Sequence, residues 1–437
     1  MPILANNTAV LAGQHVSFAI DAESVIHVSQ RGTENADVVF VTEGKYSIQR
    51  AYSVGGCVQM FIHQNQLEYL LEPAHYTDPY FLKTEVDRLF LPAWHLIGSK
   101  ADLPREGDFL TREILGQPLI VRREQGYHCF LNVCSHRHCK LTSLPCGNDE
   151  RLSCQYHGWQ YKMDGYTSKI PDARCFRPFD RANARLHKFR LEECGDLLFV
   201  SLADSGPSLR EHLGNYFDLV DELFRPPYQQ IWTWEKEFDC NWKVPVENTV
   251  ETYHLPSVHK GYFSGVYPSE GAQTHELNDR YSTLTYDLSE DPKVTRNSRR
   301  VLKALGGRQP DDQYRHHIRH PNLVFATSDL FLHAQVYLPV SATRTLTIVR
   351  FFAYQGTNKN PWAWFNRRIS NWVGRKMDLE VQTEDARVFD QAQQGIEKTR
   401  YKGCLGTREE RIYVFHNYIH QRCCREQPDR ANRVLAF

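Results

Sequence analysis

The chain has 437 residues, 24% of them charged and 41% hydrophobic, which is an ordinary globular composition. Lys+Arg and Asp+Glu both number 52, and this balance excludes the chain-wide basic field that favours nucleic-acid partners. No apolar run reaches the ~20 residues that span a bilayer and no secretory signal is visible, so we expect no membrane partner. Twelve cysteines then indicate a cytoplasmic protein with metal or thiol chemistry rather than a disulfide scaffold.

The sequence pattern divides the chain into three stretches. Residues 1–74 contain short strand-like segments, and we assign them no role. Residues 75–205 begin with a helix, predicted from the Asp78-Pro start, and continue with short strands and glycine turns that indicate a small all-β domain. Residues 206–437 mix strands with helices, the clearest of which is predicted from about 375 to 398. The expected fold class is therefore α+β.

Two short cysteine–histidine motifs lie in the second stretch. Cys134-Ser-His136 is followed, after seventeen residues, by Cys154-Gln-Tyr-His157-Gly-Trp. Two such turns facing each other offer two thiolates and two imidazoles, which suit a zinc ion. They also suit a Rieske [2Fe–2S] cluster, in which the cysteines bind one iron and the histidines bind the other. The order of the ligands is typical of Rieske centres.

Two more cysteines, Cys139 and Cys146, lie close to the first motif. In respiratory Rieske proteins an extra cysteine pairs with a second one inside the other ligand turn, but that turn reads Cys-Gln-Tyr-His here. We therefore predict that Cys139 and Cys146 are loop thiols rather than a redox pair.

A second candidate metal site lies about a hundred residues further on. His254 and His259 are five residues apart, so an ideal helix would place their side chains ~140° from each other. Pro256 between them removes a backbone donor and disturbs the preceding turn, which lets the chain bend and bring both imidazoles together. A 2-His-1-carboxylate iron site needs one further carboxylate.

The predicted helix at 375–398 offers that carboxylate. Asp385 falls on one stripe with Val381, Val388 and Ala392, and an unpaired charge on such an apolar face is costly unless a metal neutralises it. Glu384 lies ~100° round the helix and is the runner-up. We expect two further acids of this helix, Glu380 and Asp390, to be solvated.

With both motifs in order, the chain resembles the oxygenase component of Rieske non-haem iron oxygenases over about residues 75–425. This resemblance implies a small all-β Rieske domain, then an α+β catalytic domain with an antiparallel sheet and a long helix carrying a metal ligand. It assigns the [2Fe–2S] cluster to Cys134, His136, Cys154 and His157, and mononuclear Fe(II) to His254, His259 and Asp385. One departure lies beside the cluster, where His138-Cys139-Lys140 replaces the common Arg-Gly-Ala.

The resemblance also implies a mechanism and partners. Glu251, three residues before His254, takes the place of a carboxylate that bridges to His157 of a neighbouring protomer in a homotrimer. A separate NAD(P)H-dependent reductase or ferredoxin would supply electrons, because the chain shows no nicotinamide-binding motif. We expect mono- or dioxygenation of a small molecule by O2. A Rieske electron carrier without catalysis and a zinc-stabilised binding protein are the alternatives.

Two features favour a quaternary ammonium substrate, similar to choline, betaine or carnitine. Glu rather than the commoner Asp at position 251 resembles the branch that oxidises such compounds. Aromatic residues near the site, which could hold a methylated cation against their ring faces, are Trp232, Trp234, Trp242 and Tyr253. An aromatic ring is the alternative substrate.

Overall fold

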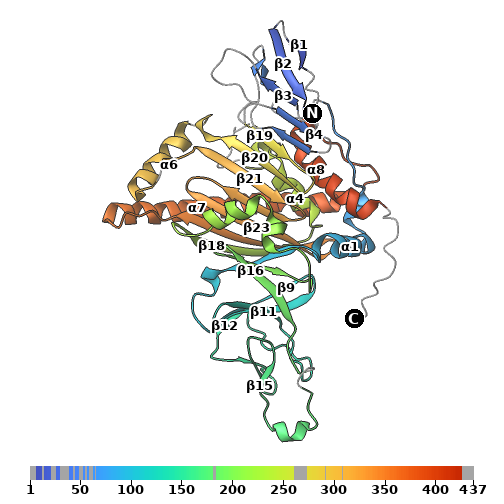
Figure 1. Ribbon diagram of the computed structural model, residues 1–437, viewed down its shortest axis with the longest axis vertical. Coiled ribbons are helices and arrows are strands. Elements are labelled where there is room, and N and C mark those ends of the chain that lie inside the picture. Colours follow the sequence, from blue (N-terminus) through green and yellow to red (C-terminus); the bar gives the residue numbers. More distant parts are fainter. Residues whose placement is uncertain are drawn as a thin grey trace.

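The computed structural model describes residues 63 and 65–425, apart from 181–183, 260–272, 291 and 308, together with strands between residues 6 and 58. Two units are visible in Figure 1: a smaller β unit at the lower end and a larger unit in which helices pack on a broad sheet. The expected α+β class, with an all-β unit before a mixed one, is confirmed.

The smaller unit is built on antiparallel strands. Its main sheet has seven strands, and a second sheet of three strands extends from it at the bottom of Figure 1. In spatial order the first sheet contains β12 (Cys146–Asn148), β9 (Asp108–Ile114), β10 (Gln117–Arg123), β11 (Tyr127–Leu131), β16 (Lys188–Cys194), β17 (Leu197–Ser201) and β8 (Trp94–Ser99), and the second contains β13 (Leu152–Ser153), β14 (Gln160–Tyr161) and β15 (Thr167–Lys169).

The larger unit contains a nine-stranded antiparallel sheet. Two of its strands come from the N-terminal stretch, because Tyr46 and Ser47 pair with Leu277 and Glu276 at the sheet edge. The spatial order is β18 (Tyr228–Phe238), β24 (Arg344–Tyr354), β23 (Phe331–Ser341), β22 (Leu323–Thr327), β21 (Gln313–Arg319), β20 (Tyr281–Asp287), β19 (Gln273–Leu277), β5 (Lys45–Ile48) and β4 (Val39–Thr42). The other N-terminal strands are β1 (Asn6–Leu11), β2 (Gln14–Ile20), β3 (Ile26–Ser29), β6 (Ser53–Val54) and β7 (Cys57–Val58).

Helices accompany both units, and the longest runs along the large sheet (Figure 1). Within the described part of the chain, no helix combines the length and apolar character needed to cross a membrane. The α-helices are α1 (Pro79–Glu85), α2 (Leu209–Leu213), α3 (Tyr216–Leu223), α4 (Lys243–Val250), α5 (Leu255–Val258), α6 (Pro292–Leu305), α7 (Pro361–Ile396) and α8 (Glu410–Ile419).

Helix α7 begins 14 residues earlier than the predicted 375. Asn360 caps it, since its side chain accepts a hydrogen bond from the Ala363 N–H at 2.8 Å, and Pro361 occupies the first turn. The early turns were missed because large apolar side chains point outward there, so no inward-facing period is visible. Trp362 and Trp372, for example, are both 64% exposed.

The helix that leads into the smaller unit packs on the larger one. Glu85, at the end of α1, accepts hydrogen bonds from the Trp242 indole at 2.9 Å and the Lys243 ammonium at 2.8 Å, and all three side chains are fully buried. Helix α1, expected to belong with the β domain, thus makes buried polar contacts with the larger unit. A buried charge needs a partner, and here the pairing fixes the start of α4, which leads into the second candidate metal site.

The two units share one continuous core. Side chains of β8 and β17 cluster with those of β22, β23 and β24. Polar contacts reinforce this junction: Arg350 Nε lies 3.0 Å from Asp102 Oδ2, and the Ser99 hydroxyl donates to Gln230 at 2.7 Å. The sheet of the larger unit is therefore held firmly against the smaller unit.

Candidate metal centres

Two matching loops carry the cysteine–histidine motifs. In the loops that begin at Cys134 and Cys154, the cysteine N–H donates to the carbonyl five residues later at 2.8 Å, and the cysteine carbonyl accepts from the N–H four residues later at 3.0 Å. In both loops that fourth residue has a positive φ, 58° at His138 and 68° at Gly158. The chain thus forms the same turn twice.

The four motif side chains gather between these loops. Cys134 and Cys154 are buried, and the rings of His136 and His157 lie 4.8 Å apart. The Trp159 ring stacks on His136 at 4.7 Å, with only 2° between the planes, and fixes that imidazole. His157 is exposed to solvent.

This donor set fits an iron–sulfur cluster. His136 Nδ1 is buried and makes no hydrogen bond with the described residues, so it is available as a ligand. Burial raises the pKa of the Cys134 thiol, and the hydrogen bond with the Tyr161 hydroxyl at 3.0 Å opposes this only in part. A metal centre would favour the thiolate instead.

The additional cysteines near this site are free thiols. Cys139 is half-buried and packs against the core around the loops, whereas Cys146 is exposed on β12. Neither forms a disulfide with the described cysteines, and Cys146 lies on a strand rather than in a loop.

His138→Gly should stabilise the first loop. A side chain in the left-handed region costs ~1–2 kcal/mol that glycine avoids, offset in part by the greater entropy of unfolded glycine. The His138 side chain is exposed, so we expect a net gain of up to about 1 kcal/mol, seen as later thermal bleaching of the visible cluster absorbance. His138→Ala is the control and should bring no gain. Earlier bleaching of His138→Gly would contradict this account.

The second site is formed where α4 gives way to α5. Glu251 is extended, with φ −123° and ψ 169°, and ends α4. His254 and His259 then flank the four-residue helix α5. Pro256 sits in the first turn of α5, where no backbone donor is needed. Glu251 thus separates α4 from the two histidines, and the chain leaves helical conformation again at His259, with φ −95° and ψ 78°.

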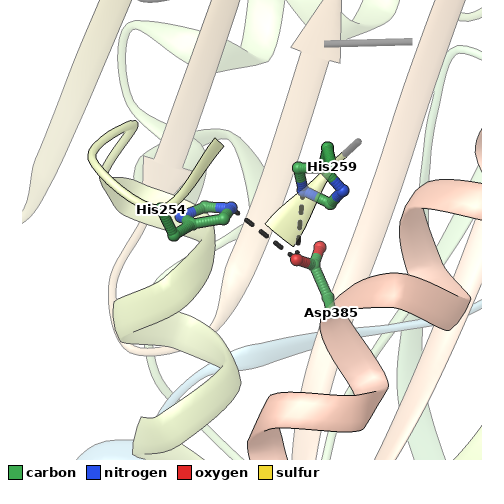
Figure 2. Close-up of side chains that lie close together, drawn as sticks. All are labelled: His254, His259 and Asp385. Atoms are coloured by element: carbon green, nitrogen blue, oxygen red, sulfur yellow. Dashed lines mark ion pairs between the residues drawn. The ribbon is translucent and has the colours of Figure 1, made fainter. Parts of the chain in front are cut away.

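Helix α7 brings Asp385 to the two histidines (Figure 2). Asp385 Oδ1 lies 3.6 Å from His254 Nε2 and 3.2 Å from His259 Nε2. The two rings are 5.3 Å apart and inclined by 68°. One carboxylate oxygen and two imidazole nitrogens thus point at a common centre.

Two glutamates are hydrogen-bonded to the imidazole nitrogens that point away from Asp385. His254 Nδ1 is hydrogen-bonded to Glu251 Oε1, and His259 Nδ1 lies 2.9 Å from Glu384 Oε2. A carboxylate at Nδ1 retains the proton there and leaves the Nε2 lone pair directed at Asp385. Carboxylate-backed histidines of this kind are typical of metal ligands.

The electrostatics of the site fit a cation. Asp385 Oδ1 is buried and forms no well-oriented hydrogen bond with the described residues. Burial lowers the pKa of His259, but the nearby carboxylates of Asp385 and Glu384 outweigh this effect and raise it above its ordinary value. Two imidazoles and one carboxylate, with negative charge behind them, suit the 2-His-1-carboxylate type of iron site.

Other expectations for α7 are corrected. The inward line of the helix passes through Gly374, Asp378, Phe389 and Gln393, whereas Ala392, expected on the inward stripe, is exposed. Asp390 is not fully solvated, because its Oδ1 is buried without a hydrogen bond to the described residues. Packing on the sheet, rather than the pattern of apolar residues in the sequence, determines which face of α7 is buried.

Glu384→Gln should weaken iron binding at this site. The amide keeps the size and an acceptor oxygen for His259 Nδ1 but removes the charge that makes the imidazole a strong ligand. We expect an iron affinity about tenfold lower, measured by competition with a chelator. The control is Glu380→Gln on the same helix, which should leave the affinity unchanged. Complete loss of the iron would instead make Glu384 a direct ligand.

Comparisons with known proteins identify both sites by class. Residues 93–189 match the Rieske [2Fe-2S] domain family, and residues 227–425 match the catalytic domain family of ring-hydroxylating alpha subunits. The smaller unit is therefore a Rieske iron–sulfur domain, and the larger unit is the catalytic domain of a non-haem iron oxygenase. The chain belongs to the Rieske oxygenases, as its motifs predicted.

Individual relatives cover different parts of the chain. The oxygenase subunit of glycine betaine monooxygenase from Chromohalobacter salexigens is 30% identical over 54% of this chain and 49% of its own length. The large subunit of anthranilate 1,2-dioxygenase from Acinetobacter baylyi is 29% identical over 53% of this chain and 51% of its own. The chain thus aligns with about half of each. The quaternary ammonium Rieske monooxygenase CntA, solved with L-carnitine, shares the fold with a TM-score of 0.66, 18% identity, and coverage of 82% of this chain and 96% of CntA.

Proposed function

We propose that this protein is a terminal oxygenase component that uses electrons from its Rieske cluster, together with O2, to hydroxylate a small organic substrate. The convergence of His254, His259 and Asp385 carries this proposal, because a Rieske electron carrier would need no second metal site. In this proposal the Rieske domain, residues 75–205, holds the cluster, and the catalytic domain, residues 206–437, holds the iron. The cluster ligands are Cys134, His136, Cys154 and His157.

The chemistry divides between the iron and the chain. When bound, the iron would supply open coordination positions at which O2 is activated. Glu251 and Glu384 would hold the two imidazoles in the tautomer and orientation that metal binding needs. Asp385 would complete the ligand set and neutralise part of the charge of the ion.

Electrons would pass between protomers of a homotrimer. In Figure 1 the cluster loops beside β13–β15 lie at the lower end, well separated from the junction of α4 and α7 in the larger unit. His157 is exposed, which supports contact with another protomer. Glu251 would then join His254 to that neighbour, and a separate reductase or ferredoxin would reduce the cluster. The free thiols of the described chain support a cytoplasmic setting.

We favour a quaternary ammonium compound as the substrate. The similarity to a glycine betaine monooxygenase and the fold shared with CntA support this choice, as does Glu at position 251. The aromatic side chains that were expected to hold a methylated cation give this substrate less support. Trp242 is fully buried in the core, the Arg375 guanidinium covers Trp232 at 3.9 Å, and Tyr253 is 60% exposed.

An aromatic acid is the second candidate substrate. The anthranilate dioxygenase relative, 29% identical over 243 residues, specifically favours it. Because this similarity covers about half of each chain, it leaves the choice between the two substrates to experiment.

Metal analysis followed by a substrate panel tests the proposal. Anaerobically purified protein should be red-brown and contain about three irons and about two sulfides per chain. With a surrogate reductase, we expect electron use coupled to product from choline, glycine betaine or carnitine, identified by mass spectrometry, and none from benzoate or anthranilate. The reverse pattern would select the aromatic substrate. Colourless protein would exclude an oxygenase, and two irons without turnover would indicate an electron carrier.

A further inference from the structure

The first half of α7 exposes large apolar side chains along its outward side. Three of the eight tryptophans of the chain lie here: Trp362 and Trp372 are each 64% exposed, and Trp364 is 54% exposed. The other exposed apolar side chains of this half are Phe365, Ile369 and Leu379. Apart from Trp364, these residues recur every three, four or seven positions, so they share the side of the helix that faces away from the sheet. A contiguous apolar face of this kind is typical of a surface that contacts a partner.

Positive charge accompanies this apolar face. Residues 359–377 include no aspartate or glutamate. The Arg368 guanidinium lies 5.1 Å from the centre of the Trp364 ring, and the Lys376 ammonium lies 5.7 Å from the centre of the Trp372 ring. Exposed rings and cations therefore alternate on one mixed surface.

A second basic helix lies beside α7. Helix α6 packs on α7 at one side of the larger unit (Figure 1), and the Asn358 side chain, just before α7, donates to the Ala304 carbonyl at 3.1 Å. Helix α6 contains five lysines and arginines and no acid. A groove of about 490 Å³ along it is lined by Ser289, Thr295, Arg296, Arg299, Arg300 and Lys303. Of the four cations in this groove, only Arg299 forms an ion pair with a described carboxylate, that of Asp312. The groove therefore suits an anionic group such as a phosphate.

The charge of this surface indicates which partner it fits. A second copy of the chain, paired through the same face, would bring cations against cations with no acid to balance them, which disfavours self-association. The cations are also spread over two neighbouring helices, so they match a broad negative surface better than a single acidic helix. The surface of an anionic bilayer offers phosphate groups to lysine and arginine, and its interfacial region accommodates indole rings.

We propose that residues 361–379 of α7, together with α6, bind the protein reversibly to the surface of an anionic lipid bilayer. The exposed rings would enter the interfacial region, and the cations of both helices would contact the headgroups. The sequence-based expectation of no membrane partner considered segments that cross a bilayer, whereas a helix that lies on the surface needs no such segment. This inference goes beyond the proposed oxygenase function and does not depend on it.

Cosedimentation of the full-length, metal-loaded protein with lipid vesicles tests the proposal. One set of vesicles is phosphatidylcholine alone, and the other contains about 30% phosphatidylglycerol. The protein should bind the anionic vesicles at least about tenfold more tightly. This preference should disappear at about 1 M salt, where the screening length falls to about 3 Å. Tryptophan fluorescence should shift to shorter wavelength on binding, because exposed indole rings leave water.

Two variants separate the apolar contribution from the charged one. Trp372→Ala should lose about tenfold in affinity for the anionic vesicles, because it removes the apolar area of one indole. Lys376→Gln should lose about fivefold, and only for the anionic vesicles. The control is Tyr80→Ala on α1, which removes an aromatic side chain that is 83% exposed and should bind like the native protein. Circular dichroism and the visible spectrum of the cluster verify that each variant is folded.

Three results would overturn the proposal. The first is that the native protein binds neither kind of vesicle, and the second is that Trp372→Ala binds the anionic vesicles as tightly as the native protein. The third is that size-exclusion chromatography finds a smaller assembly for Trp372→Ala than for the native protein, which would make this face a contact between copies of the chain. Failure of the proposed oxygenase function would appear separately, as the absence of product in the substrate panel.

Discussion

Asp385→Ala should release the mononuclear iron and leave the Rieske cluster intact. The iron content should fall from about three to about two per chain while the red-brown colour remains, because only one of the two sites loses a ligand. The two imidazoles would keep their glutamate partners but lack the carboxylate that faces both Nε2 atoms. Turnover should fall by at least about a hundredfold, as measured by product formation together with iron analysis and the EPR spectrum of the reduced cluster.

A matched variant separates loss of the ligand from loss of charge on α7. Glu380→Gln removes an acid from the same helix and should keep both the iron and the activity. If Asp385→Ala retains full iron and full activity, the assignment of Asp385 is wrong. Glu384, which lies 2.9 Å from the outer nitrogen of His259, would then have to turn inward and serve as the third ligand.

Glu251→Gln should stop turnover without removing either metal centre. The glutamine nearly keeps the shape of the side chain but loses the charge that faces His254 Nδ1. Glu251 also accepts hydrogen bonds from the backbone N–H groups of Tyr253 and His254, which an amide can satisfy only with its single oxygen. We therefore expect the reductase to reduce the cluster normally and product formation to fall by about 10–100-fold.

Rapid mixing of the pre-reduced enzyme with substrate and O2 isolates the affected step. The cluster of Glu251→Gln should reoxidise far more slowly than that of the native protein, although its iron content is unchanged. Glu409→Gln is the control. Burial raises the pKa of the Glu409 carboxyl and the charge of the nearby Glu251 raises it further, but Glu409 makes no hydrogen bond to His254 or His259 in the described structure. Undiminished reoxidation in Glu251→Gln would show that the glutamate is not needed between the two sites.

Much of the candidate metal chemistry is visible in the sequence because its ligands are close together along the chain. Cys134 and His136, or Cys154 and His157, lie within one turn, so spacing alone predicts which side chains meet. His254 and His259 are separated by only five residues. The α+β class and the order of the two units follow from the same local signals.

Tertiary structure decided what supports these ligands. Glu384 lies 125 residues from His259 along the sequence, and the local pattern offered it only as a second candidate for the metal ligand, not as the partner of His259 Nδ1. The pairing of β5 with β19 and the packing of α1 on α4 are equally distant contacts. Long-range pairs depend on which faces pack together, and periodicity does not specify the partner.

The helix that carries Asp385 shows this division most clearly. The sequence predicted its C-terminal part and singled out Asp385 from the apolar residues around it. Its first 14 residues were missed because Trp362, Trp372 and other large apolar side chains face outward. The inward line instead carries small and polar residues such as Gly374, Asp378 and Gln393, and only the sheet beneath α7 determines that this face is buried. A sequence reports hydrophobicity, whereas burial is a property of the packed fold.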